Sequence, residues 1–231
     1  LAYVITGDPT VDNISAAGLL GLSAVLTERT SVEPIAPIGV NIETDDLSLL
    51  PMLYWPITPD QAALSDGAVQ RLNRYLATGG MIVFDTRDAQ LGSGFGVLTA
   101  NGKALQRLTA SLDIPPLAPI PAGHVLTRAF YLLEDFPGRW SGPDVWVEVS
   151  AGGTNLNDGV TPIVIGANDW AAAWAVTDSG QPMFPVGRGL TGERQRELAR
   201  RFGVNLVMYV LTGNYKSDQV HVPAFLERLG E

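Results

Sequence analysis

The sequence of 231 residues carries a formal net charge of -9 and contains no cysteine. Its length fits one α/β domain, which would bury roughly 70–75% of the surface that the unfolded chain exposes. The acidic balance repels phosphate backbones and anionic lipid headgroups, so it disfavours nucleic acid and peripheral membrane surfaces as partners. The missing cysteines exclude thiol nucleophiles, disulfides and thiolate metal sites. We therefore expect a single domain over residues 1–231 that binds an unknown protein or small molecule.

The chain starts without a methionine or a signal peptide, and residues 1–6 read directly as a buried strand. This start predicts a domain taken from a longer polypeptide. No apolar run approaches the ~18 residues that a membrane-spanning helix needs. Any membrane attachment is therefore expected only through upstream segments.

The segment 75–88 predicts the centre of the fold. Gly79 and Gly80 suit the left-handed backbone that ends a helix, and residues 81–84 are apolar enough for a strand that is buried on both faces. Asp85 follows immediately. In open α/β sheets ligands bind beyond the carboxyl ends of the strands, so a site is expected where this strand ends.

Apolar runs and helix signals predict the remaining elements in chain order. The parallel core of the sheet is predicted at residues 2–6, 52–55, 81–85 and 162–166. Further extended segments are predicted at 32–40, as an edge strand, and at 145–149. Helices are predicted from Asp12 or Asn13, at 45–50, from Thr58 or Ser65, around 105–112, and from 193 to 211 with Gly213 as the closing residue.

Four segments give a weaker pattern. Residues 125–133 and 171–176 fit either a helix or a strand. Residues 114–121 are rich in proline and are predicted to be a connector within the domain. Residues 151–159 are predicted to be a mobile turn region because Gly and Asn dominate there.

Several short motifs resemble one known family. They are residues 3–8, Tyr54-Trp55, 79–85, 130–133 with 136–138, Asn168-Asp169-Trp170, and 203–212. Over nearly the whole chain these motifs resemble the bacterial family called domain of unknown function 4159. The resemblance implies a fold similar to class I glutamine amidotransferases and trehalose-utilisation proteins: a flavodoxin-like (Rossmann-like) three-layer sandwich with a mostly parallel sheet. It also implies a domain at the end of a longer membrane-anchored protein, and it implies no catalytic residue.

Acidic turns form the main candidate site. If the strands are parallel, their carboxyl ends meet at one edge of the sheet, and carboxylate and amide oxygens there suit Mg²⁺ or Ca²⁺, or accept sugar hydroxyls. The competing interpretation is that the aspartates cap helices and pair with an arginine. A divalent cation is the one cofactor candidate, and no other cofactor is expected. The candidate ligand-binding residues are Asp8, Trp55, Asp85, Arg87, Asp88, Asn168, Asp169 and Trp170.

Other motifs are interpreted as structural. Glutamine hydrolysis through a thiolate is excluded, and a serine substitute would need a Gly-x-Ser-x-Gly elbow that is absent. The glycine-rich stretch 92–96 is interpreted as a flexible loop rather than a phosphate cradle. His124 and His221 are placed in loops as surface or hydrogen-bonded residues. An arginine cluster is predicted to be a solvated helix face, because Glu193 and Glu197 interleave with it: Arg194, Arg196, Arg200 and Arg201.

Two hypotheses of function follow. The first is a non-catalytic ligand- or partner-binding domain of a bacterial cell-envelope protein, with the periplasmic side favoured over the cytoplasmic side. The alternative is a hydrolase-like enzyme that acts on a carbohydrate or polyol at the carboxyl edge of the sheet, with Asp85 or Asp169 as the acid or base. An open edge with converging carboxylates favours the enzyme, and a filled edge favours the binding domain.

Overall fold

The computed structural model describes residues 1–91, 98–142, 144–148 and 161–229, with side chains described as far as residue 212. Its centre is a seven-stranded mixed sheet with the order β2-β1-β3-β4-β7-β6-β5. The strands are β1 (Ala2–Val4), β2 (Ile38–Val40), β3 (Met52–Pro56), β4 (Met81–Asp85), β5 (Leu117–Pro119), β6 (Trp146–Glu148) and β7 (Ile163–Gly166). The five neighbouring strands are parallel, namely β2, β1, β3, β4 and β7. β6 and β5 extend the sheet in antiparallel pairing. The four predicted core runs all lie in the parallel part, so that prediction is confirmed.

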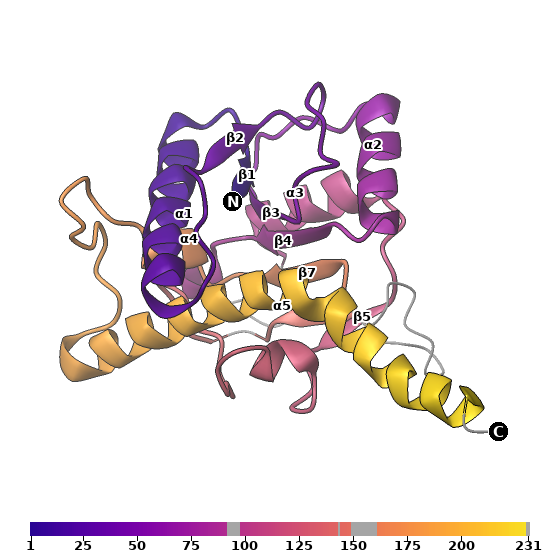
Figure 1. Cartoon of the computed structure of the whole chain (residues 1–231). Coiled ribbons are helices and arrows are strands. Elements are labelled where there is room, and N and C mark those ends of the chain that lie inside the picture. Colours follow the sequence, from indigo (N-terminus) through magenta and orange to yellow (C-terminus); the bar gives the residue numbers. More distant parts are fainter. Residues whose placement is uncertain (92–97, 143, 149–160, 230–231) are drawn as a thin grey trace.

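Helices cover both faces of this sheet (Figure 1). One face is covered by α1 (Pro9–Arg29), α4 (Trp170–Trp174) and α5 (Gly189–Leu229), and the other by α2 (Asp66–Ala77) and α3 (Ala100–Thr109). Side chains alternate between two hydrophobic clusters along the central strands: Tyr54 and Val83 belong to the first cluster, and Trp55 and Phe84 to the second. The result is the three-layer α/β sandwich that the sequence predicted, in a flavodoxin-like arrangement.

Helix α1 is apolar along most of its length and packs one face against the sheet, α4 and α5. Gly18 and Gly21 allow this contact, since a Cβ at either position would come within 2.4 Å of the Ala171 carbonyl oxygen or 2.0 Å of the Trp174 carbonyl oxygen. The helix is long and apolar enough to cross a membrane by length and composition alone, but half of its most apolar window is buried inside the domain. Close packing on α4 therefore accounts for its composition.

The predicted start of α1 at Asp12 or Asn13 is wrong. Asp8 caps the helix by accepting hydrogen bonds from the backbone N of Thr10 at 2.9 Å and of Val11 at 3.3 Å. Asp12 instead accepts from the backbone N and the hydroxyl of Thr6, both at 2.8 Å, and so ties the end of β1 to the first turn of the helix. A Pro at the first helical position was the missed signal.

Several other boundaries differ from the prediction. Residues 45–50 form turns rather than a helix, and the predicted start at Thr58 is wrong because Ser65 caps α2 through the backbone N of Ala68. Gly79 has the expected positive φ of 95°, whereas Gly80 does not. Residues 114–121 contain β5, so they are more than a connector.

In the C-terminal half the two undecided segments are helical. Residues 125–133 include the short 3-10 helix η2 (Val125–Arg128), and residues 171–176 mostly belong to α4. Gly213 does not close the last helix, which continues to Leu229 and so also contains His221. A glycine costs a helix only about 1 kcal/mol, so it did not mark an end here. The predicted loops at 92–96 and 151–159 lie outside the described residues.

Candidate functional site at the carboxyl edge

The connection from β7 to α4 is a tight turn at the carboxyl edge of the sheet. Asp169 adopts a left-handed conformation with φ 55° and ψ 55°, and α4 begins at Trp170, the next residue. α/β hydrolases present their nucleophile on a sharp, strained strand-to-helix turn of this kind. Asp169 therefore stands where such an enzyme carries its nucleophile.

Asp85, at the end of β4, fills the space behind this turn. Its Oδ1 accepts hydrogen bonds from the backbone N of Arg87 at 2.9 Å and of Asp169 at 3.1 Å. Its Oδ2 accepts from the backbone N of Trp170 and from the Tyr54 hydroxyl, both at 2.8 Å. The side chain is fully buried. In an elbow enzyme the amide after the nucleophile helps to bind the oxyanion, but here Asp85 occupies that amide.

Burial controls the charges of this network. Desolvation raises the pKa of Asp85, although four hydrogen bonds to its carboxylate oppose the change. Desolvation and the neighbouring Asp85 raise the pKa of Asp169 to about 7, against the opposite effect of Arg87 and Arg139. Because the two carboxyl groups interact, they titrate as a pair that carries fewer than two negative charges near neutral pH.

The raised pKa of Asp169 predicts how stability depends on pH. The Asp169 carboxyl keeps its proton up to about pH 7 in the folded state but releases it near pH 3.8 in the unfolded state. The free energy of unfolding is therefore highest below pH 3.8, as far as this group decides it, and falls as the pH rises towards about 7. Between pH 5 and pH 8 the wild type should lose roughly 2–3 kcal/mol more unfolding free energy than Asp169→Asn, which cannot titrate. Urea titrations of both proteins at the two pH values measure this difference. Parallel pH profiles for the two proteins would contradict it.

The other candidate residues near this edge have structural partners. Arg87, with φ 58°, donates through Nη2 to the carbonyl oxygen of Ile57 at 2.9 Å, and the expected ion pair with an aspartate is not formed within the described residues. Asp88 accepts hydrogen bonds from the hydroxyls of Thr86 and Thr99, and Thr99 in turn caps α3. The helix-capping interpretation therefore describes Asp8, which caps α1, and Asp85, which accepts from the amides at the start of α4, but not Asp169, whose side chain makes no cap hydrogen bond.

The remaining candidates are buried. Trp55 packs on Phe84 with ring centroids 5.2 Å apart, and Trp170 packs on Phe202 at 5.0 Å, so neither offers a ring face to a sugar in this structure. The Asn168 side chain donates through Nδ2 to the carbonyl oxygen of Phe136 at 2.8 Å. Across the described part of the chain, no three Asp, Glu or His side chains are grouped to hold a metal ion. The divalent cation stays a prediction without a preformed cluster among these residues.

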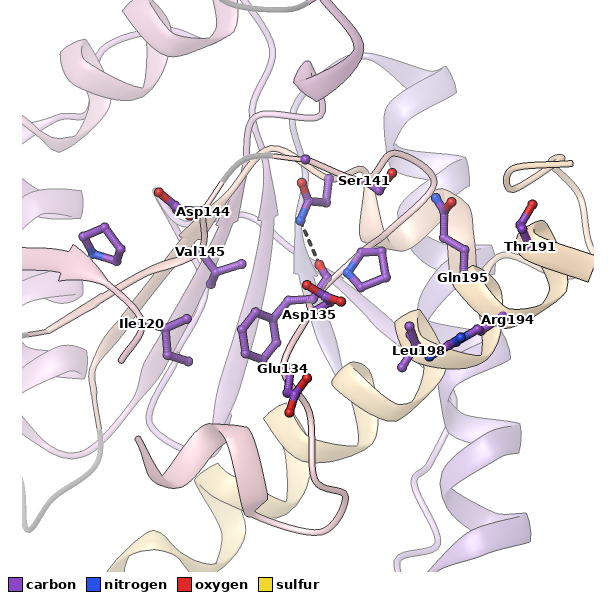
Figure 2. A pocket seen from close by; sticks show the side chains of 15 residues that line it. Ile120, Glu134, Asp135, Ser141, Asp144, Val145, Thr191, Arg194, Gln195 and Leu198 are labelled. Carbon is purple, nitrogen blue, oxygen red and sulfur yellow. Dashed lines mark hydrogen bonds between the residues drawn. The ribbon is translucent and has the colours of Figure 1, made fainter. Parts of the chain in front are cut away.

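A cavity of about 500 Å³ lies next to the end of β7. Figure 2 shows Gln195, Arg194 and Leu198 of α5 on one side and Ile120 and Val145 on the other. The dashed line in Figure 2 is the hydrogen bond between Asn168 and Phe136, both of which line the cavity. Three carboxylates also belong to its lining: Glu134, Asp135 and Asp144. Neither Asp85 nor Asp169 lines it, so the cavity and the buried carboxylate pair are separate features.

Sequence reasoning missed the loop that joins these two features. The sequence predicted only a loop at residues 137–143, yet Gly138 lies so close to the Asn168 carbonyl oxygen that a Cβ would come within 2.2 Å of it. Arg139 and Trp140 donate their backbone N–H groups to the carbonyl oxygens of Asp169 and Asn168. The sequence signal was a glycine followed by Arg and Trp, which nothing in its spacing distinguished from an ordinary turn.

The fold and site define a flavodoxin-like α/β domain with a strand-to-helix elbow whose amides are occupied by a buried aspartate. The chain belongs to the family described as Domain of unknown function (DUF4159), whose family model matches residues 1–211. No curated protein matches it significantly. Family membership agrees with the resemblance of the sequence motifs and assigns no activity.

Proposed function

We propose that this chain is a non-catalytic ligand-binding domain of a bacterial cell-envelope protein. The observation that carries the proposal is the filled carboxyl edge: Asp85 takes the amides of Asp169 and Trp170, while a separate cavity stands open beside β7. A cavity of about 500 Å³ falls in the range of small-molecule sites, which are concave, partly apolar and supplied with a few polar groups. The resemblance to a family of membrane-anchored proteins supports the envelope context.

The lining of the cavity indicates the kind of ligand. Ile120, Phe136 and Leu198 give it an apolar wall. Its polar groups are Thr191 and Arg194 of α5 and the carboxylates Glu134, Asp135 and Asp144. Gln195 is less available, because its Nε2 already donates to the carbonyl oxygens of Gly138 and Arg139. A small molecule with an apolar part and a polar end fits this lining better than a flat protein surface does.

Ligand-observed NMR with a library of small polar metabolites tests this function. Hits for the wild type should be lost in Leu198→Trp, because the larger side chain fills the cavity from α5. Leu211→Trp, on the same helix but outside the cavity lining, is the matched control and should keep the hits. Hits that survive Leu198→Trp, or no hits at all, would argue against a binding cavity.

A hydrolase-like enzyme remains the second candidate, because Asp169 stands on an elbow turn and has a pKa of about 7, close to the value that suits acid or base catalysis. Of the two carboxylates, only Asp169 is free of hydrogen bonds from the backbone, so it would carry the chemistry on a carbohydrate or polyol. Hydrolysis of a glycan that disappears in folded Asp169→Asn would favour this candidate over the binding domain.

A further inference from the structure

Several residues at or near the carboxyl edge of the sheet carry buried polar atoms without a partner. Within the described residues, five buried side-chain atoms have no hydrogen-bond partner: Trp55 Nε1, Arg87 Nε, Arg139 Nε, Trp140 Nε1 and Asn168 Oδ1. All belong to the ends of β3, β4 and β7 or to the loop 136–142 that contacts them. Four of the five are N–H donors, and buried unpaired donors are rare enough in folded proteins to need an explanation. Of these donors, Nε of Arg139 belongs to a charged group, and a guanidinium with a free donor suits an oxyanion acceptor.

Arg139 is the residue in this group that can meet a ligand. Its guanidinium makes cation–π contacts with two rings, since its Cζ lies 4.8 Å from the centroid of Trp140 and 4.9 Å from that of Phe184. Its side chain is 26% exposed. Its Nη1 lies 3.8 Å from Oδ2 of Asp169, an ion pair longer than a hydrogen bond, and its Nε has no hydrogen-bond partner. The planar guanidinium is therefore only loosely engaged by Asp169 and keeps donors for an oxyanion.

The surroundings hold Arg139 in place. Its backbone N–H donates to the carbonyl oxygen of Asp169, and its own carbonyl oxygen accepts from Gln195 Nε2 at 3.0 Å. The two aromatic rings fix the plane of the guanidinium. A binding group that is already ordered loses little entropy when a ligand arrives, so even a small anion can gain from it.

We propose that Arg139, held by its contacts with Trp140 and Phe184, binds an oxyanion group of a ligand, and that the carboxylate of Asp169 competes with this oxyanion for the guanidinium. The site goes beyond the proposed cavity function, because Arg139 does not line the cavity and neither site requires the other. A planar carboxylate and a tetrahedral sulfate or phosphate share the acceptor geometry that a guanidinium fork recognises.

The charged and titratable groups around Asp169 determine at which pH its carboxylate competes with a bound anion for Arg139. They are Asp85 of β4, Arg87 after β4, Arg139 of the loop and, through Asp85, the protonated hydroxyl of Tyr54 on β3. With Asp169 neutral and Asp85 ionised, these groups carry a net charge of one positive unit, which favours an anion. With Asp169 ionised the net charge is zero and a carboxylate already faces Arg139. Because the pKa of Asp169 is about 7, the neutral fraction falls from about 0.9 at pH 6 to about 0.1 at pH 8, and affinity should fall about tenfold.

An NMR titration of the Arg139 Nε–H resonance tests the proposal. The probes are sodium sulfate and sodium acetate at constant ionic strength, since both keep their charge between pH 6 and pH 8. Wild type should bind one or both about ten times more tightly at pH 6 than at pH 8. Asp169→Asn, whose asparagine tolerates the left-handed backbone, should bind at pH 8 as tightly as wild type binds at pH 6. Tighter binding of sulfate would identify a sulfate- or phosphate-bearing ligand, and tighter binding of acetate a carboxylate-bearing one.

Two variants separate this site from the cavity. Arg139→Gln removes the fork, so anion-dependent shifts of the neighbouring Trp140 indole N–H should vanish. Arg194→Gln, which changes the exposed arginine of the cavity, should leave anion binding unchanged. The Asp169→Asn result stands even if Arg139→Gln does not fold. The proposal is overturned if neither anion shifts the Arg139 resonance, if affinity is equal at the two pH values, or if Arg194→Gln abolishes binding.

Discussion

Asp85→Ala is expected to destabilise the domain by about 3–5 kcal/mol, although no ligand is involved. The substitution leaves the backbone N–H groups of Arg87, Asp169 and Trp170 and the hydroxyl of Tyr54 without an acceptor in a site that is closed to solvent. Each unpaired buried donor destabilises the folded state, because alanine has no acceptor that could replace the carboxylate. Urea unfolding at pH 7, followed by circular dichroism, measures the loss.

Asp8→Ala is the matched control for this experiment. Both aspartates accept hydrogen bonds from the first amides of a helix, but Asp8 is exposed, so water replaces it and the loss should be only about 1 kcal/mol. If Asp85→Ala costs no more than Asp8→Ala, then the Asp85 network is open to solvent and the account of a filled edge is wrong.

Phe84→Ala is expected to cost about 3–5 kcal/mol, because it removes a large side chain from the middle of the second hydrophobic cluster. Phe84 has no exposed surface, and its ring packs against that of Trp55. The cavity that remains would lie among buried side chains of the same cluster, whose close packing limits how far they can move into it.

The exposed Phe130 supplies the control for this variant. Phe130→Ala removes the same side chain from a position that is 44% exposed, so its cost should stay below about 1 kcal/mol. Denaturant titration of both variants decides the matter. Equal losses would mean that Phe84 does not lie in a tightly packed core.

The sequence predicted the parallel core well because apolar runs there are buried on both faces. Met81 to Phe84 can be covered on both sides only at the centre of a sheet, and the structure places them there. The antiparallel edge was harder to predict. β6 lies within the extended segment predicted at 145–149, whereas β5, Leu117 to Pro119, is only three residues long and contains a proline, so it gives no clear strand pattern.

The sequence predicted where in the sheet the candidate site lies, but not the hydrogen-bond partners of its residues. The prediction that Asp85 and Asp169 lie close together at the carboxyl edge agrees with the hydrogen bond from the Asp169 amide to Asp85. The sequence could not show that Asp85 accepts from a helix start 84 residues further along the chain, since capping patterns are recognised only within a few residues. Arg139 was missed for the same reason: its contacts with Asp169 and Phe184 depend on how the chain folds back.

Hydrogen exchange at the backbone amide of Trp170 tests the central claim most directly. If Asp85 fills the carboxyl edge, this amide is buried and hydrogen-bonded, and it should exchange only through global unfolding, with protection equal to the unfolding free energy of the domain. The amide of Thr10, which donates to the exposed Asp8, should exchange many times faster. A Trp170 amide that exchanges as quickly as that of Thr10 would show an open oxyanion site and would contradict the account of a non-catalytic domain.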